Sequence, residues 1–188
     1  MPMNWMHRTL CSSDKWAAKV RDLLLPWALK DVELGRDVLE IGPGFGATTR
    51  VLVGNVPHLT AVEVDPGSAD RLRREFGGRA TIVTGDATAL EFPDDSFDGV
   101  VCFTMLHHVP SAAAQDRLFA EACRVLRPGG LFAGSDSTTS ARFRFLHLGD
   151  TNVTVDPDRL PDRLTAAGFG TAEVSKGTGS FRFRARKP

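Results

Sequence analysis

Three carboxylates stand where apolar segments of the chain end, and carboxylates at such positions can hold a polar ligand. Glu40 lies near the end of DVLEI, Glu63 near the end of HLTAVEV, and Asp86 follows ATIVT in a Gly-Asp-Ala step. An acid about 20 residues after a glycine-rich turn can accept hydrogen bonds from both hydroxyls of a ribose, which fits Glu63. Asp86 is placed to accept from the exocyclic amine of a purine. A solvated carboxylate or a simple turn is the alternative at each position.

Glycines directly follow the first of these carboxylates. The run VLEIGPGFG contains Gly42, Gly44 and Gly46, and TTRVLV after it has helical character. Glycine has no side chain, so a ligand can approach the backbone N–H groups at the start of such a helix. The pattern predicts a strand, a ligand-binding glycine turn and a helix. A tight turn that binds nothing is the alternative.

Three histidines in the second half of the chain are candidates for a general base. His107 and His108 belong to FTMLHHVP, and His147 belongs to ARFRFLHLGD, a segment that could form a lid; Asp136 is a fourth candidate. Imidazole changes its protonation state near neutral pH, so it can remove a proton from a hydroxyl acceptor. Packing or support of a cofactor is the alternative for the adjacent pair.

The elements that must position these residues alternate between strand and helix. Strands are expected at 37–41, 58–64, 80–84, 97–103 and 131–135, with helices at about 66–76 and 111–126. Such alternation produces right-handed crossovers and a parallel sheet that is covered on both faces. The carboxyl ends of parallel strands share one edge, which brings Glu40, Glu63 and Asp86 together. The expected fold class is α/β, doubly wound.

The two ends of the chain depart from this alternation. Apolar residues recur at helical spacing from Asp14 to Trp27, which predicts an amphipathic helix before the sheet. A helix at about 156–168 is followed by TAEVSK and SFRFRAR, and the short Gly-Thr-Gly link between these runs predicts an edge hairpin. We expect one domain over residues 1–188. Its parts are an N-terminal helical cap (1–36), a binding core (37–135), and a closing region of lid segment, last helix and hairpin (136–188).

Composition and charge are those of an ordinary globular domain. The 188 residues are 42% hydrophobic and 24% charged, and 23 basic residues balance 23 acidic ones. Zero net charge gives no field to draw nucleic acid or an anionic membrane, so neither partner is expected. The three cysteines lack the spacing of a disulfide framework or a zinc site, and no leader or membrane span is evident, so we expect a reduced, cytoplasmic protein.

Five segments together resemble a known family. In order they are VLEIGPGFG, AVEVDP, GDATALEFPDDSFDGVV, LHHV and RVLRPGGLF, within about Asp37 to Ser135. Their order and spacing resemble the class I S-adenosylmethionine (SAM)-dependent methyltransferases of the small ubiquinone/menaquinone-methyltransferase-like type (methyltransferase type 11). The resemblance implies a Rossmann-like, seven-stranded sheet in the order 3-2-1-4-5-7-6, with strand 7 antiparallel. It also implies SAM as cofactor and S-adenosylhomocysteine as product.

The resemblance assigns a part of the cofactor to each segment. It implies that the methionine half is bound by Glu40, Gly42, Gly44 and Gly46, with Phe103 and Thr104 at its end. It implies that the ribose is bound by Glu63 with Val64 beside it, and the adenine by Asp86 and Ala87. The roles argued from residue chemistry and the roles implied by the resemblance coincide at Glu63 and Asp86.

Three alternatives to a SAM-dependent enzyme stay open. Gly42, Gly44 and Ala47 also satisfy the G-x-G-x-x-G/A fingerprint of nicotinamide-binding folds, although the chain has no tyrosine for a Tyr-x-x-x-Lys hydride-transfer site. A regulatory or scaffold protein that binds SAM without catalysis would carry the same cofactor motifs. A fold without any cofactor is disfavoured because the glycines, Glu63 and Asp86 are all intact.

The absence of certain motifs narrows the range of molecules that could accept the methyl group. No Asn/Asp-Pro-Pro-aromatic motif follows position 103, Cys102 lies within a strand, and Asp136 precedes serine rather than asparagine. These features argue against methylation of DNA-base or glutamine nitrogens, of cytosine C5, and of catechols with a bound metal. The sequence therefore predicts metal-independent, in-line transfer to a small molecule, with no metal site.

The wall of the acceptor cleft is the least defined part of the site. Trp5, Met6 and Trp16, or a second subunit in a homodimer, are candidates to complete it. Residues 142–145 alternate arginine and phenylalanine, which in an extended segment would give one basic and one apolar face. We expect an exposed ribbon with its phenylalanines packed inward; an anion-binding face is the alternative.

Overall fold

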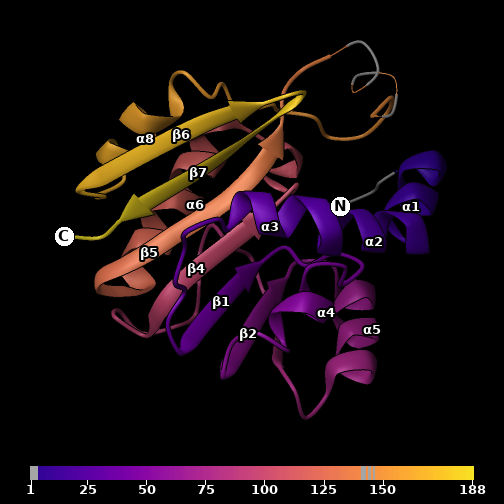
Figure 1. The fold of residues 1–188 in the computed structure, drawn as a ribbon, viewed down its shortest axis with the longest axis horizontal. Coiled ribbons are helices and arrows are strands. Elements are labelled where there is room, and N and C mark those ends of the chain that lie inside the picture. The colour runs from indigo at the N-terminus through magenta and orange to yellow at the C-terminus, as the bar shows by residue number, and fades with distance from the viewer. Residues whose placement is uncertain (1–3, 141–142, 144, 146) are drawn as a thin grey trace.

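A seven-stranded sheet forms the centre of the computed structural model, which describes residues 4–140, 143, 145 and 147–188 (Figure 1). The strands in chain order are β1 (Asp37–Ile41), β2 (His58–Glu63), β3 (Thr81–Thr84), β4 (Phe97–Phe103), β5 (Leu126–Ser137), β6 (Thr171–Gly177) and β7 (Ser180–Arg186). Their spatial order is β3-β2-β1-β4-β5-β7-β6, with parallel pairs from β3 through β5. β7 is antiparallel to both of its neighbours. The expected α/β, doubly wound, Rossmann-like fold is confirmed.

Helices cover both faces of this sheet. They are α1 (Trp5–Cys11), α2 (Asp14–Lys19), the π-helical turn η1 (Val20–Leu24), α3 (Leu25–Ala28), α4 (Thr49–Leu52), α5 (Pro66–Phe76), the 3-10 turn η2 (Leu106–His108), α6 (Ala112–Val125) and α8 (Leu160–Ala166). Figure 1 shows the segment from α2 to α3 crossing in front of the central strands, with α6 behind the sheet and α8 near its β6 edge. Within the described ranges, no helix has the length and apolar character needed to cross a membrane.

The alternation of side chains along the central strands explains why both faces are buried. Val38 and Val101 pack in an apolar cluster with the N-terminal helices, whereas their neighbours Leu39 and Val100 pack in a second cluster with α6 and α8. Successive residues of a strand point to opposite faces, so a strand buried on both sides is apolar throughout. This double burial holds the strand ends, and the site on them, in fixed positions.

The N-terminal segment begins as its sequence predicts and is then divided. The hydroxyl of Ser13 accepts a hydrogen bond from the backbone N–H of Trp16 (3.2 Å), which caps α2. Pro26 has no backbone N–H, and the single expected helix is divided into α2, η1 and α3. α1 is an additional helix that the apolar spacing does not predict. Its signal is Asn4, whose side chain accepts from the backbone N–H of His7 at 2.9 Å.

Two boundaries differ clearly from expectation. β5 begins at Leu126 rather than 131, because Leu126 pairs with Phe97 and Leu131 with Gly99, so that residues 127–130 bulge out between the two pairs. α8 begins at Leu160 rather than near 156. The side chain of Asp156 accepts from the backbone N–H of Asp158 at 2.9 Å and forms a turn instead of a helical cap.

The segment after β5 differs from the extended ribbon expected at 142–145. Phe143 and Phe145 are helical, and the backbone N–H of His147 donates to the carbonyl of Phe143 at 3.2 Å. Phe145 is 63% exposed, so it does not pack inward. The expected extended backbone is therefore wrong at both positions, and the expected inward packing is wrong at Phe145 but right at Phe143, whose ring packs on His107 and His147. Arg142 and Arg144 lie outside the described residues.

Candidate functional site

A cavity of about 370 Å³ lies at the carboxyl ends of the central strands. Its volume is within the range of about 300–1,000 Å³ that is common for small-molecule sites. Eight of the ten residues predicted to bind a cofactor line it: Gly42, Gly44, Glu63, Val64, Asp86, Ala87, Phe103 and Thr104. The other two, Glu40 and Gly46, lie behind its wall.

The glycines of the turn after β1 serve different purposes. All three have positive φ (+67°, +57° and +77° for Gly42, Gly44 and Gly46), a region that side chains disfavour. A Cβ at Gly46 would lie 2.8 Å from the ring of Phe76, so this glycine lets the turn pack on α5. A Cβ at Gly44 would meet nothing within 4 Å, because this position opens onto the cavity. The turn thus leaves room for a ligand at Gly44.

Glu63 joins the end of β2 to this turn. Its Oε2 accepts from the backbone N–H of Gly44 at 2.9 Å, and its Oε1 accepts from the backbone N–H of Asp65 at 3.0 Å. The residue is 7% exposed. Each carboxylate oxygen has two lone pairs, so Glu63 can accept from two ligand hydroxyls while it holds the turn.

Glu40 lies behind the turn and is fully buried. The hydroxyl of Thr48 donates to its Oε1, and the hydroxyl of Thr49 donates to its Oε2 at 2.7 Å. Burial raises the pKa of Glu40 from 4.5 to about 7, although the two hydroxyls oppose this rise. Glu40 therefore anchors the start of α4 in this structure.

Asp86 begins the long connection between β3 and β4. Its Oδ1 accepts from the backbone N–H of Thr88 at 2.8 Å, which leaves Oδ2 available for a ligand. Val64 also lines the cavity and is 50% exposed although it is apolar. An exposed apolar side chain beside a carboxylate suits a flat heterocycle that also carries an amine.

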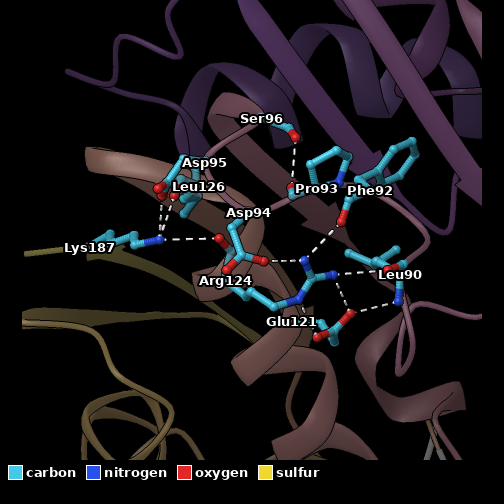
Figure 2. Close-up of polar contacts among 10 residues, drawn as sticks. All are labelled: Leu90, Phe92, Pro93, Asp94, Asp95, Ser96, Glu121, Arg124, Leu126 and Lys187. Atoms are coloured by element: carbon cyan, nitrogen blue, oxygen red, sulfur yellow. Dashed lines mark hydrogen bonds and ion pairs between the residues drawn. The ribbon is translucent and has the colours of Figure 1, made fainter.

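Arg124 of α6 holds the connection that Asp86 begins (Figure 2). Its guanidinium donates to the carbonyls of Leu90 (2.9 Å) and Phe92 (2.8 Å) and to the carboxylates of Glu121 and Asp94. Glu121 in turn accepts from the backbone N–H of Leu90 at 2.7 Å. A single planar side chain thus fixes the loop against the helix.

The end of β4 has a strained backbone at the cavity. Thr104 has φ of +52°, which is uncommon for a residue other than glycine, and its backbone N–H donates to the carbonyl of Ser135 at 2.8 Å. Thr104 and Phe103 both line the cavity. Such strain is found where a position near a ligand is held by its surroundings.

The three predicted base candidates lie together, but among them only His108 lines the cavity. Nδ1 of His107 lies 2.5 Å from Oδ1 of Asp136, and Nε2 of His107 lies 3.2 Å from Nε2 of His147. Burial, followed by the neighbouring imidazoles of His107 and His7, lowers the pKa of His108 to about 3. His108 is therefore neutral at neutral pH and a weak base.

A fourth histidine, His7 of α1, joins this group and was not expected from the sequence. It is buried, lines the cavity, and places Nδ1 2.9 Å from Oδ2 of Asp150. No local pattern marks it, because its partner is 143 residues away. Trp16 also lines the cavity as expected, whereas Trp5 and Met6 are exposed and do not.

The fold and these motifs agree with a comparison to protein families. Residues 39–134, about half of the chain, match the family described as the methyltransferase domain. The chain therefore belongs to this family and has the fold of the class I SAM-dependent methyltransferases. The narrower ubiquinone/menaquinone-type resemblance stays a prediction.

Individual relatives cover the chain to different extents. A "Probable S-adenosylmethionine-dependent methyltransferase" of Mycolicibacterium smegmatis is 31% identical over 161 residues, which are 81% of this chain and 60% of the relative. Ribosomal RNA small subunit methyltransferase A of Bordetella pertussis is 50% identical, but over 56 residues, which are 29% of this chain and 21% of the relative. The chain thus spans about a fifth of that curated relative.

A solved structure extends the likeness in fold to the whole chain. A SAM-dependent methyltransferase from Thermotoga maritima superimposes with a TM-score of 0.76 and 19% identity, covering 97% of this chain and 98% of that one. At this identity the match concerns the fold alone. It shows that the N-terminal helices and the closing hairpin both belong to a known arrangement.

Proposed function

We propose that the chain transfers a methyl group from SAM to a small molecule held in the cavity between the glycine turn and the N-terminal helices. The observation that carries this proposal is that one cavity joins the eight predicted cofactor residues to a separate wall formed by His7, Cys11, Trp16 and Val20. The open position at Gly44 and the buried acceptor at Glu63 fit the cofactor. The N-terminal wall is where an acceptor would make contact.

Each lining residue has a role in this proposal. Glu63 accepts from the ribose hydroxyls, and Asp86 accepts from the adenine amine between Val64 and Ala87. The methionine half follows the turn at Gly42 and Gly44 toward Phe103 and Thr104. Glu40 and Gly46 support the turn from behind, as their contacts with Thr49 and Phe76 indicate.

Bound SAM supplies an electrophilic methyl group on a sulfonium, and the protein's task is to align an acceptor and exclude water. Trp16 and Val20 cover the cavity from the N-terminal side and reduce its exposure to solvent. His108 can accept a proton there, but its low pKa makes it a weak base. A neutral amine, a thiolate or a carbanion is therefore a better acceptor than an unactivated hydroxyl.

The observations favour a small molecule over nucleic acid as the acceptor. The likeness to ribosomal RNA methyltransferases covers 29% of this chain, and the net charge is zero. A SAM-binding protein without catalysis is the second candidate, and the weak basicity of His108 is the observation that favours it. A cytoplasmic location and a homodimer stay predictions from the sequence.

Calorimetric titration with SAM, S-adenosylhomocysteine and NADH tests the cofactor. We expect micromolar binding of the first two ligands and none of NADH. Release of S-adenosylhomocysteine in the presence of small amines and thiols then tests catalysis, with a ribosomal RNA fragment as a parallel substrate. Turnover on RNA alone would overturn the choice of acceptor, and binding without any turnover would favour the non-catalytic candidate.

A further inference from the structure

Four of the five histidines in the chain gather in one cluster beside the cavity. His7 comes from α1, His107 and His108 come from η2, and His147 comes from the segment after β5. We propose that His7, His108 and His147 together bind one divalent transition-metal ion of the Zn²⁺ type. The sequence predicts no metal site because its cysteines lack the spacing of metal ligands and it has no Asp-Asn pair. These three histidines come from segments far apart in the chain, so no sequence motif joins them.

The positions of the ring nitrogens suit a single ion. One nitrogen from each of the three rings lies within 4.8 Å of the other two. Zinc binds imidazole nitrogen at about 2.0–2.1 Å in tetrahedral geometry, which places two ligand nitrogens about 3.3 Å apart. The three nitrogens must therefore approach one another by up to about 1.5 Å when the ion binds. Three histidines plus one exchangeable ligand is a common arrangement for catalytic zinc.

Hydrogen bonds to the outer ring nitrogens already orient two of the ligands. Nδ1 of His147 lies 2.8 Å from the carbonyl of Phe143, and a carbonyl can only accept, so Nδ1 carries the proton and Nε2 has a free lone pair. Nδ1 of His7 likewise faces the carboxylate of Asp150 at 2.9 Å. Metal-binding histidines characteristically donate their other N–H to a carboxylate or a carbonyl in this way.

One contact within the cluster requires a positive charge. Nδ1 of His107 donates to Asp136, so its Nε2 is also a lone pair, and this lone pair faces Nε2 of His147 at 3.2 Å. Two lone pairs at this distance repel each other unless a proton or a metal ion interacts with them. An ion bound to Nε2 of His147 would occupy that lone pair, and His107 would stay outside the ligand set, held by Asp136.

The buried charges of the cluster also favour a dication. The side chains of Asp136 and Asp150 are each 1% exposed. In the part of the chain that the structure describes, each of them pairs with a histidine, and neither pairs with a lysine or an arginine. Buried carboxylates without a compensating charge are costly. A divalent ion among neutral imidazoles would balance both of them.

The fourth coordination position would face the cavity. His7 and His108 both line it, together with Thr104 at the end of β4. An ion at this place could bind an oxygen, nitrogen or sulfur atom of a ligand. The contact between the ion and a ligand in the cavity rests on the proposed function, whereas binding of the metal ion to the three histidines does not.

Metal binding can be measured on the full chain without SAM or acceptor. The purified protein is stripped with a chelator and titrated with Zn²⁺ by calorimetry and with Co²⁺ by visible absorption. We expect one ion per chain and the intense bands of tetrahedral Co²⁺. His147→Ala and His7→Ala should abolish high-affinity binding, and Asp150→Asn should weaken it by about 10- to 100-fold. His58→Ala is the matched control, because His58 is exposed on β2 and pairs with Asp37.

The outcomes separate this proposal from the proposed function. Wild-type protein that binds less than a tenth of an equivalent of Zn²⁺ and Co²⁺ would overturn the metal site and leave a proton shared by His107 and His147. Equal binding by His147→Ala and His58→Ala would also overturn it. Circular dichroism checks that each variant is folded, and His108→Asn provides a smaller change. Titration with SAM in parallel tests the cofactor site independently of the metal.

Discussion

The carboxylate of Glu63 accepts a hydrogen bond from the backbone N–H of Gly44 at 2.9 Å, so the end of β2 holds the turn that follows β1. The same carboxylate accepts from the backbone N–H of Asp65 at 3.0 Å. A ligand that binds across both strand ends therefore meets a turn that already has its shape. Preorganisation of this kind reduces the ordering cost of binding.

Replacement of Glu63 by alanine should weaken SAM binding by about 5- to 150-fold, which corresponds to the 1–3 kcal/mol lost when buried donors have no acceptor. The loss has two sources, the ribose contacts and the support of the turn at Gly44. Calorimetric titration measures it. Glu173→Ala is the control, because Glu173 is an exposed residue of β6 that pairs with Arg184. Equal affinities in the two variants would show that Glu63 does not contact the cofactor.

Steric exclusion at Gly44 can be separated from backbone strain. Gly129, in the bulge of β5, also has positive φ (+77°) and also has no atom within 4 Å of an added Cβ. Gly44→Leu and Gly129→Leu should each lose stability by about 1–2 kcal/mol, because both place a side chain in the left-handed region. Only Gly44→Leu should lose SAM binding, by at least a hundredfold. Retained affinity in Gly44→Leu would place the cofactor elsewhere.

The sequence predicts the position of some site residues well, because they follow strands that are easy to recognise. Glu63, Asp86 and the glycines follow strands whose apolar runs are easily recognised, so their meeting at one sheet edge follows from parallel topology alone. The edge hairpin is predicted correctly from the short Gly-Thr-Gly link, whereas the correct strand order is what the resemblance to the family implies. Glu40 occupies the expected place, yet its hydrogen bonds to Thr48 and Thr49 turn it away from the cavity.

What the sequence does not predict depends on contacts between distant segments. His7 joins the cluster because Asp150 orients it across 143 residues, and no periodicity records such a pair. The bulge in β5 arises from register with β4, and the turn at Asp156 arises from a side chain that competes with the helix. Pro26 is visible in the sequence, but the π-helical turn beside it depends on packing against the sheet.

Arg124 should stabilise both the fold and the loop that carries Asp86. Arg124→Lys removes the planar fork that reaches the carbonyls of Leu90 and Phe92, and a lysine cannot replace both contacts. We expect a loss of about 1–3 kcal/mol in the free energy of unfolding by urea. Hydrogen exchange at residues 86–96 should rise as well. Arg21→Lys is the control, since the Arg21–Asp22 pair is more than half exposed; equal effects would show that the network contributes nothing.

Glu40 should make the stability of the protein depend on pH. Its pKa is raised from 4.5 to about 7 in the folded state, chiefly by burial, so the folded state binds the proton more tightly than the unfolded chain. This contribution to stability is fully present below pH 4.5 and is lost as the pH rises through about 7. Each pH unit between the two pKa values corresponds to about 1.4 kcal/mol, so the loss reaches about 3 kcal/mol.

Glu40→Gln has no proton to lose, and its amide can donate to one threonine hydroxyl while its oxygen accepts from the other. The stability of this variant relative to the wild type should therefore rise between pH 5 and pH 8. Urea unfolding at several pH values measures the difference, and Glu33→Gln at an exposed position is the control. A difference between Glu40→Gln and the wild type that stays constant over this range would mean that Glu40 keeps an ordinary pKa despite its burial.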